Sequence, residues 1–409
     1  MWARIATLPT EVRQYLLVTG NYWAFTLTDG ALRMLVVLYF HQLGYSALEV
    51  ALLFLFYEFF GVVTNLVGGW LGARLGLNRT MNLGLGLQIV ALAMLLVPAA
   101  WLSVPWVMAA QALSGIAKDL NKMSAKSAIK TLVPTTGEHG GAGTLYRWVA
   151  LLTGSKNALK GVGFFLGGLL LTLLGFQGAV LAMALMLVLV LSLSLIKLTA
   201  ELGRAKAKPK FRDILSKSRA INVLSAARLF LFGARDVWFV VALPVFLTTD
   251  FSWDHWQVGG FMATWVIGYG AVQASAPRLT GTDHAGRRGA IAWAAALTLI
   301  PALIALGLDW QPAPFLLGGL LLFGAVFAIN SSLHSYLIVH MARADGVSLD
   351  VGFYYMANAM GRLVGTLLSG WIYMNAGLAA CLWASTAMLA TTVAISFALP
   401  AEKSQQASI

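Results

Sequence analysis

Four lysines stand one helical turn apart in a largely apolar stretch of the chain: Lys118, Lys122, Lys126 and Lys130. Residues four positions apart share one face of an α-helix. The residues just upstream, VPWVMAAQALSGIA, are apolar enough to lie in lipid. Charged side chains at bilayer depth are tolerated when they face a bundle interior or a water-filled cavity. This lysine stripe therefore predicts a cationic cavity surface, for which the natural ligand is an anion.

The lysine stripe also has simpler interpretations. Its last two lysines, together with Arg147, are expected at the cytoplasmic boundary of the membrane, where long basic side chains reach the lipid headgroups. The deeper two, Lys118 and Lys122, flank Asp119. A structural ion pair with this aspartate is the alternative there to ligand binding.

Basic residues recur in other apolar segments, namely Arg33, Lys156, Lys160, Arg228, Arg235 and Arg362. Asp29 precedes Arg33 by four positions, so the two can neutralise each other on one helical face, and Asp236 follows Arg235 directly. Two guanidinium groups, such as those of Arg33 and Arg235, can grip a phosphate-like oxyanion through paired hydrogen bonds. These basic residues are therefore predicted to bind substrate, with helix bracing as the alternative.

Two further polar residues stand isolated in apolar segments. Glu58, within FLFYEFFGVV, could carry a proton at neutral pH and release it on exposure to water. Proton coupling through Glu58 or Asp29 is therefore a hypothesis, and pairing of Glu58 with a cavity lysine is its alternative. His334 is interpreted as a cavity-lining hydrogen-bonding residue, because no second histidine or cysteine stands at metal-ligand spacing. Aromatic residues such as Tyr57 and Tyr355 are interpreted as packing residues or interfacial anchors.

The elements that position these residues are predicted to be membrane-spanning helices. The chain has 409 residues, of which 59% are hydrophobic and 11% charged, whereas soluble proteins average about 45 to 50% and about 25%. A span needs about 20 apolar residues, and the sequence offers twelve such stretches. Basic residues gather in alternate connections, which places both termini in the cytoplasm and explains the net charge of +12 without a nucleic-acid partner.

An internal repeat divides the chain into an N-terminal six-helix half (1–200), a basic cytoplasmic linker (201–219) and a C-terminal six-helix half (220–409). Residues 157–175 align without a gap to residues 359–377. This register matches Lys160 to Arg362 and Gly163 to Gly365. Each half also has a small-residue spacing, Gly163-xxx-Gly167 and Gly361-xxx-Gly365, which would permit close helix contact.

Parallel six-helix repeats resemble the build of major facilitator superfamily transporters, whose substrate site lies near the midplane between the halves. The superfamily's loop signature G-x-x-x-D-R-x-G-R-[RK] is partly matched by GWLGARLGLNR, from Gly69. Ala73 replaces the acidic residue, so the usual charge latch at this loop is not expected. No phosphate-binding loop of the G-x-x-x-x-G-K-[ST] type is present, so transport is expected to be secondary.

Several longer strings, among them GNYWAFTLTDGALRMLVVL, ALSGIAKDLNKMSAKSAIK and SRAINVLSAARLFLFGARDVWFVVALP, resemble the organoarsenical efflux permeases, the ArsJ type of major facilitator transporter. The resemblance implies export of 1-arseno-3-phosphoglycerate from a bacterial cell through its inner membrane. It also implies a companion glyceraldehyde-3-phosphate dehydrogenase that makes this ester, so that the two together confer arsenate resistance. A functional monomer without a cofactor is expected.

The residues fit such a cargo independently of the resemblance. Trivalent arsenic is normally bound by several thiolates, and Cys381 is the one cysteine of the chain. Arsenate and phosphate esters are hard oxyanions that suit arginine and lysine. The phosphate is expected between Arg33 and Arg235. The arsenate end is expected toward the lysines at Lys118, Lys122, Lys156 and Lys160.

Two competing functions stay open at this point. The first is an organic-phosphate or phosphate exchanger of the same superfamily, because cavity charge defines the sign of the cargo and not its direction. The second is a membrane-embedded enzyme or scaffold. An enzyme would need a nucleophile, a metal cluster or a cofactor motif, and none is visible in the sequence. The chain is therefore predicted not to be an enzyme.

Overall fold

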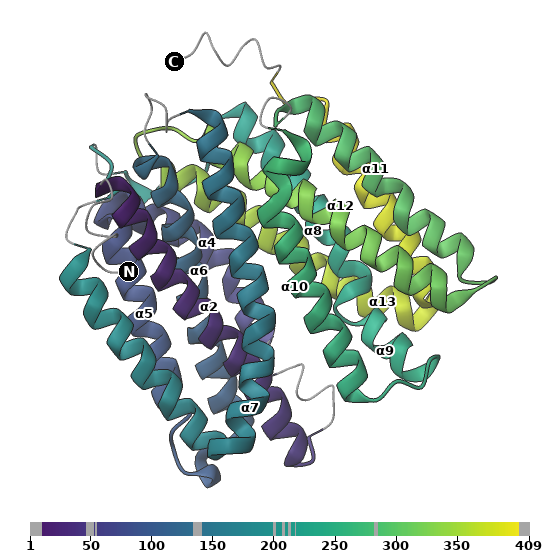
Figure 1. Ribbon diagram of the computed structural model, residues 1–409, viewed down its shortest axis with the longest axis horizontal. Coiled ribbons are helices and arrows are strands. Elements are labelled where there is room, and N and C mark those ends of the chain that lie inside the picture. The colour runs from purple at the N-terminus through teal and green to yellow at the C-terminus, as the bar shows by residue number, and fades with distance from the viewer. Residues whose placement is uncertain are drawn as a thin grey trace. The chain divides into compact units, whose positions relative to one another are not determined.

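The computed structural model describes residues 10–45, 53, 55–133, 141–198, 202–206, 209–211, 214–216, 218–281 and 285–400. Within these ranges the chain is helical apart from short connections, and no strand occurs (Figure 1). The elements in chain order are α2 (Thr10–Gln42), α4 (Leu55–Leu75), α5 (Leu77–Met94), the short 3₁₀ helix η1 (Ala99–Trp101), α6 (Val104–Leu132), α7 (Ala142–Lys197), α8 (Arg219–Phe239), α9 (Ala242–Thr249), α10 (His255–Thr280), α11 (Arg287–Gly307), α12 (Pro312–Met341) and α13 (Val347–Ser396).

Two of these helices are long enough to cross a bilayer twice. α7 has 56 residues and α13 has 50, and each bends at a glycine with positive φ, Gly175 (φ 67°) and Gly377 (φ 73°). Only glycine adopts this backbone conformation readily, so each marks a turn between two spans. Divided at these glycines, and with α8 and α9 counted as one span, the described helices provide the twelve segments that the sequence predicts.

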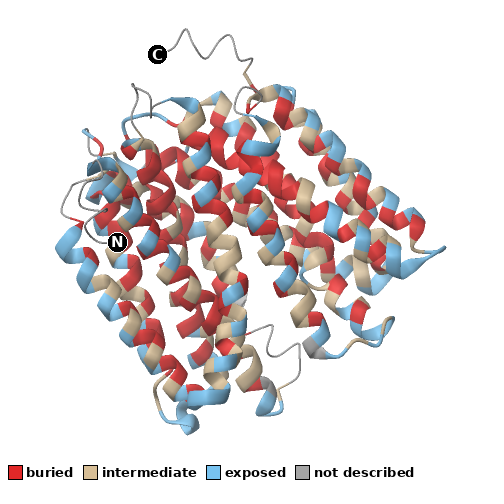
Figure 2. Cartoon of the chain, in the orientation of Figure 1, coloured by how far each residue is buried: buried red, intermediate tan, exposed pale blue. Residues whose placement is uncertain are grey.

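Six described helical stretches meet a strict test of length and apolarity for a membrane span. They comprise α2, α7, α8 together with α9, α11, α12 and α13. Along α7, side chains such as Leu173, Leu185 and Ile196 are exposed. Figure 2 shows exposed residues, in pale blue, over much of the outer surface of the helices. In a membrane protein such side chains face lipid, where their exposure carries no hydrophobic cost.

The chain divides into two compact units, each with its own apolar core. The first unit comprises Met1–Leu145, Ser155–Leu215 and Ala342–Met356, and the second comprises Tyr146–Gly154, Ser216–Met341 and Ala357–Ile409. The core of the first unit includes Phe25, Phe40 and Leu92, and that of the second includes Trp238, Phe323 and Leu382. Each unit therefore also includes a short piece from the other half of the sequence.

Glycines bring helices into backbone contact at corresponding places in the two units. In the first unit, a Cβ added at Gly163 of α7 would lie 2.6 Å from the Leu27 carbonyl oxygen and 3.1 Å from the Gly30 Cα of α2. In the second unit, a Cβ added at Gly365 of α13 would lie 2.6 Å from the Gly233 carbonyl oxygen of α8. A Cβ added at Gly167 or Gly361 would lie closer still, against the Ala31 carbonyl oxygen and the Leu229 carbonyl oxygen respectively. The predicted close helix contacts at these small-residue spacings are thereby confirmed.

The loop between α4 and α5 is fastened by backbone groups where the acidic residue of the loop signature is missing. The Ala205 N–H donates to the Ala73 carbonyl at 2.9 Å, and the Leu77 N–H donates to the Leu202 carbonyl at 2.8 Å. The Trp70 indole N–H donates to the Pro209 carbonyl at 3.0 Å. Leu202, Ala205 and Pro209 of the predicted linker thus contact this loop region within the first unit.

Candidate anion-binding site

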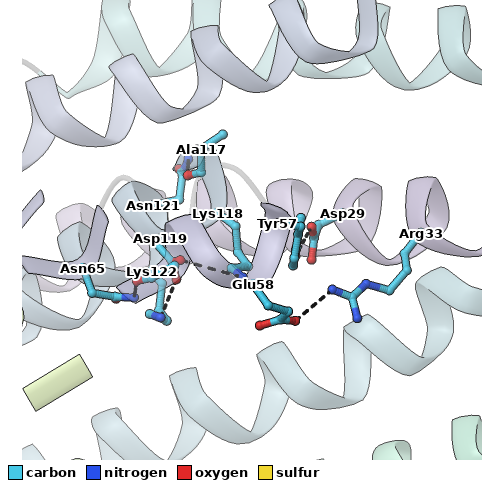
Figure 3. Close-up of polar contacts among 11 residues, drawn as sticks. Asp29, Arg33, Tyr57, Glu58, Asn65, Ala117, Lys118, Asp119, Asn121 and Lys122 are labelled. Atoms are coloured by element: carbon cyan, nitrogen blue, oxygen red, sulfur yellow. Dashed lines mark hydrogen bonds and ion pairs between the residues drawn. The ribbon is translucent and has the colours of Figure 1, made fainter. Parts of the chain in front are cut away.

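In the first unit, two neighbouring residues of α4 contact the acid and the base of α2 (Figure 3). The Tyr57 hydroxyl donates to Asp29 Oδ1 at 2.6 Å. The guanidinium group of Arg33 pairs with Glu58, with Nη2 lying 3.2 Å from Oε1. Asp29 and Arg33 stand four positions apart on α2, and the sequence suggests that they pair with each other. In the structure each instead contacts a residue of α4, Asp29 with Tyr57 and Arg33 with Glu58.

The lysine stripe of α6 joins the same network. Lys122 Nζ lies 2.5 Å from Asp119 Oδ1, and Lys118 Nζ lies 3.8 Å from Asp119 Oδ2. These are the ion pairs expected as the alternative to ligand binding. Lys118 also lies over the Tyr57 ring, with Nζ 3.8 Å from the ring centroid, and the Arg33 Cζ lies 4.5 Å from the same centroid. Two cations therefore share one aromatic ring.

The C-terminal half of the lysine stripe contacts the segment that begins α13. Lys126 and Lys122 lie over the Tyr355 ring, at 5.0 and 4.9 Å from its centroid. Lys130 donates to the Ala342 carbonyl. Lys126 is only 2% exposed, so the expectation that it reaches the lipid headgroups is wrong. The cation–π contact with the Tyr355 ring offsets part of the free-energy cost of removing the Lys126 ammonium group from water.

In the second unit a single buried carboxylate joins two arginines. Arg235 lies 2.6 Å from Asp236 Oδ1, and the Arg362 Nε donates to Asp236 Oδ2 at 3.1 Å. The side chain of Asp236 is fully buried, whereas Arg362 is partly exposed. This triad links α8 to α13, which suits the helix-bracing alternative for Arg235 and Arg362.

Arg228 lies in a separate polar network of the second unit. Its Nε donates to Asn358 Oδ1 at 2.8 Å, and its Nη2 donates to Ser331 Oγ at 3.2 Å. Gln273 donates to the same Ser331 oxygen at 3.0 Å. His334, one turn further along α12, is fully buried, and neither of its ring nitrogens has a hydrogen-bond partner within the described residues.

The two predicted lysines of α7 are half-buried. Lys156 and Lys160 stand four apart on this helix. The Lys160 carbonyl lies against Gly30 of α2, which places this part of α7 beside the segment that carries Arg33. A hydrogen bond of 2.8 Å from the Trp23 indole N–H to Ser155 Oγ joins the same two helices.

Comparison of the two units shows an exchange of charge at equivalent positions. Gly30 contacts Gly163 in the first unit and Gly233 contacts Gly365 in the second. Three residues after these glycines stand Arg33 and Asp236. The position that holds a carboxylate between two arginines in the second unit therefore holds a cation in the first.

Sequence reasoning missed the part played by two tyrosines. Tyr57 and Tyr355 were expected to be packing residues, yet each lies beside two cations of the candidate site. The one local signal was that Tyr57 directly precedes Glu58 in an otherwise apolar segment. Within the described residues, no group of three His, Cys, Asp or Glu side chains is placed to hold a metal ion.

The long apolar helices carry buried charged groups and are arranged in repeated units. This combination is typical of a polytopic membrane transporter. A family model described as Major Facilitator Superfamily matches residues 18–239, which is more than half of the chain. The chain belongs to the Major Facilitator Superfamily. It is therefore a multi-pass membrane transporter and not an enzyme.

Solved structures of other transporters are similar over nearly the whole chain. The human organic anion transporter MFSD10 (TETRAN) is 17% identical, with a TM-score of 0.76, and the match covers 95% of this chain and 100% of that one. A bacterial homologue of the iron transporter ferroportin, in its outward-facing state, is 13% identical with a TM-score of 0.72, covering 95% and 99%. The E. coli fucose:proton symporter FucP is 11% identical with a TM-score of 0.73, covering 96% and 100%. Such identities show a shared fold, and no curated protein matches the chain significantly.

Proposed function

We propose that this transporter exports 1-arseno-3-phosphoglycerate from a bacterial cell by secondary active transport, and that it thereby confers arsenate resistance. The observation that carries the proposal is the cationic network of the first unit. Arg33 and three lysines of the stripe lie together with two aromatic rings, against the carboxylates of Asp29, Glu58 and Asp119. A phosphate or arsenate oxyanion is the ligand class that such groups bind most strongly.

The chemistry of arsenic narrows the cargo further. Trivalent arsenic is a soft ion that thiolates bind. The chain has one cysteine, Cys381, which is buried in α13 with its Sγ 3.8 Å from the Ser369 carbonyl oxygen. A single buried thiol does not make a multi-thiolate site. An arsenate ester needs hard donors instead, and the residues of the first unit proposed to bind it are Arg33, Lys118, Lys122, Lys156 and Lys160.

Two further observations support the proposed cargo. The strings that resemble organoarsenical efflux permeases include the segments carrying Arg33, the lysine stripe and Arg235. The human structure with the same fold is described as an organic anion transporter, which agrees with an anionic cargo. Transport follows alternating access, in which the two repeats rearrange around the bound anion. The protein acts as a monomer in the inner membrane.

Arsenate resistance tests the proposal directly. An arsenic-sensitive bacterium is grown in arsenate with this protein, with a glyceraldehyde-3-phosphate dehydrogenase, with both or with neither, and arsenite serves as the parallel challenge. We expect resistance to arsenate only when both proteins are present, and none to arsenite, because the dehydrogenase must first make the ester. Growth no better than that of the empty strain, with the protein confirmed in the membrane, would contradict the proposal. Vesicle uptake of phosphate esters would then test the exchanger alternative.

Glu58 provides a second test, of coupling to protons. In the Glu58→Gln variant, Arg33 loses an internal carboxylate that competes with the cargo. We expect affinity for an organic phosphate to rise about two- to fivefold, since a partly exposed ion pair contributes up to about 1 kcal/mol. Proton-driven transport in vesicles is expected to be lost, because glutamine cannot carry a proton. Glu11→Gln, at an exposed position of α2, is the control, and full proton-driven transport by the Glu58 variant would exclude Glu58 as the proton carrier.

A further inference from the structure

The first unit keeps an acid and a base of one helix apart although their spacing favours a pair. Asp29 and Arg33 lie four positions apart on α2, where an aspartate and an arginine normally attract each other. The Tyr57 hydroxyl donates to Asp29 at 2.6 Å, and Glu58, the next residue of α4, lies 3.2 Å from Arg33. Figure 3 shows the two contacts side by side.

The two contacts differ in their access to water. Asp29 is 5% exposed and Tyr57 is fully buried, so their hydrogen bond is shielded from a ligand. The side chains of Arg33 and Glu58 are 25% and 28% exposed. An incoming anion can therefore displace Glu58 from Arg33, while the hydrogen bond between Tyr57 and Asp29 stays in place.

The Tyr57 ring also places a second cation. Lys118 Nζ lies 3.8 Å and Arg33 Cζ lies 4.5 Å from its centroid. In the view of Figure 3, Lys118 lies to one side of Tyr57 and Arg33 to the other. Attraction to the ring face holds both cations without neutralising either. Tyr57 thereby positions Arg33 and Lys118 with its ring and holds the Asp29 carboxylate with its hydroxyl.

We propose that Tyr57 is a positioning residue of the anion site. Its hydroxyl donates a hydrogen bond to Asp29 and so keeps Asp29 from pairing with Arg33. Arg33 pairs with the more exposed Glu58 instead, and an oxyanion can replace Glu58. The cargo class is an organic phosphate or arsenate ester, and in this respect the inference rests on the proposed function. Tyr57 acts through Arg33 and Lys118. Its loss affects how tightly the anion binds, because Asp29 then turns to Arg33 and neutralises it.

The test separates the hydroxyl from the ring. Tyr57→Phe keeps the ring and removes the hydrogen bond to Asp29. Asp29→Asn keeps the shape of the side chain and removes its charge. Binding of 3-phosphoglycerate to the purified full-length protein is measured by titration calorimetry for each variant and for the double variant. Tyr39→Phe is the control, because Tyr39 of α2 stacks on Phe176 with 4.1 Å between ring centroids, away from the cations.

We expect Tyr57→Phe to weaken binding about five- to tenfold, which corresponds to about 1 kcal/mol or more. Adding Asp29→Asn is expected to restore wild-type affinity, because position 29, one turn before Arg33, then no longer carries a charge that can neutralise it. A structural role for the hydroxyl would not give this rescue. Unchanged binding in Tyr57→Phe, or an equal loss in the double variant, would overturn the inference.

These outcomes are distinct from failure of the proposed function. A wild-type protein that binds 3-phosphoglycerate but gives no arsenate resistance would refute the arsenical cargo, and the comparison of variants would still decide the role of Tyr57. A wild-type protein that binds no phosphate ester would refute both.

Discussion

Replacement of Asp236 by alanine is expected to destabilise the detergent-solubilised protein by about 3–5 kcal/mol, because it leaves buried cations without their counterion. Asp236 is fully buried and accepts from both Arg235 and Arg362. The loss falls toward the lower end of this range because Arg362 is partly exposed and keeps some water. The measurement is the thermal melting temperature, together with the amount of protein that remains monodisperse.

Two further variants sharpen this prediction. Asp309→Ala removes an exposed carboxylate near the end of α11 and is expected to leave the melting temperature unchanged. Asp236→Asn keeps two polar atoms between the arginines, so it should lower the melting temperature less than Asp236→Ala does. Equal melting temperatures for Asp236→Ala and the wild type would show that the triad does not brace α8 against α13.

The second large effect is expected at the glycines where helices touch. Gly365→Leu places a side chain against the backbone of α8, since even a Cβ would lie 2.6 Å from the Gly233 carbonyl oxygen. Backbone cannot move aside as a flexible side chain does, so the cost should exceed about 3 kcal/mol, the upper end for ordinary overpacking. We expect little folded protein in the membrane, measured by expression and by gel filtration.

The chain provides matched controls for the glycine variants. A Cβ at Gly370, five residues further along α13, would have no atom within 4 Å, so Gly370→Leu should fold. The repeat predicts the same contrast in the first unit, with Gly163→Leu damaging and Gly168→Leu tolerated, since Gly168 meets only a Leu38 methyl at 3.6 Å. Normal folding of either damaging variant would contradict the packing described here.

The repeat is where sequence and structure agree most closely. A gapless alignment matched Gly163 to Gly365, and both glycines prove to be crossing points of corresponding helix pairs. This agreement has a local physical basis, because a glycine spacing fixes which helix face allows close approach. Apolar length likewise predicts spans, since each must satisfy its own backbone hydrogen bonds in lipid.

Charge pairing is where sequence reasoning was least successful. Spacing along one helix suggested that Asp29 would neutralise Arg33, yet both take partners on α4. The position of Lys126 suggested the membrane boundary, yet this lysine is buried beside Tyr355. Residues far apart in the chain decide such contacts, and an i,i+4 pair contributes only about 0.5 kcal/mol, which a tertiary contact easily outweighs.

The sequence by itself determined the helical class, the positions of the spans and the repeat, because hydrophobic length and glycine spacing act within one or two neighbouring segments. It also determined the surplus of cations on which the proposed anionic cargo rests. Only the tertiary structure decided which carboxylate faces which cation, and that two tyrosines lie between them. Those partners come from α2, α4, α6 and α13, and their pairing is set by how the helices pack against one another, which no local pattern encodes.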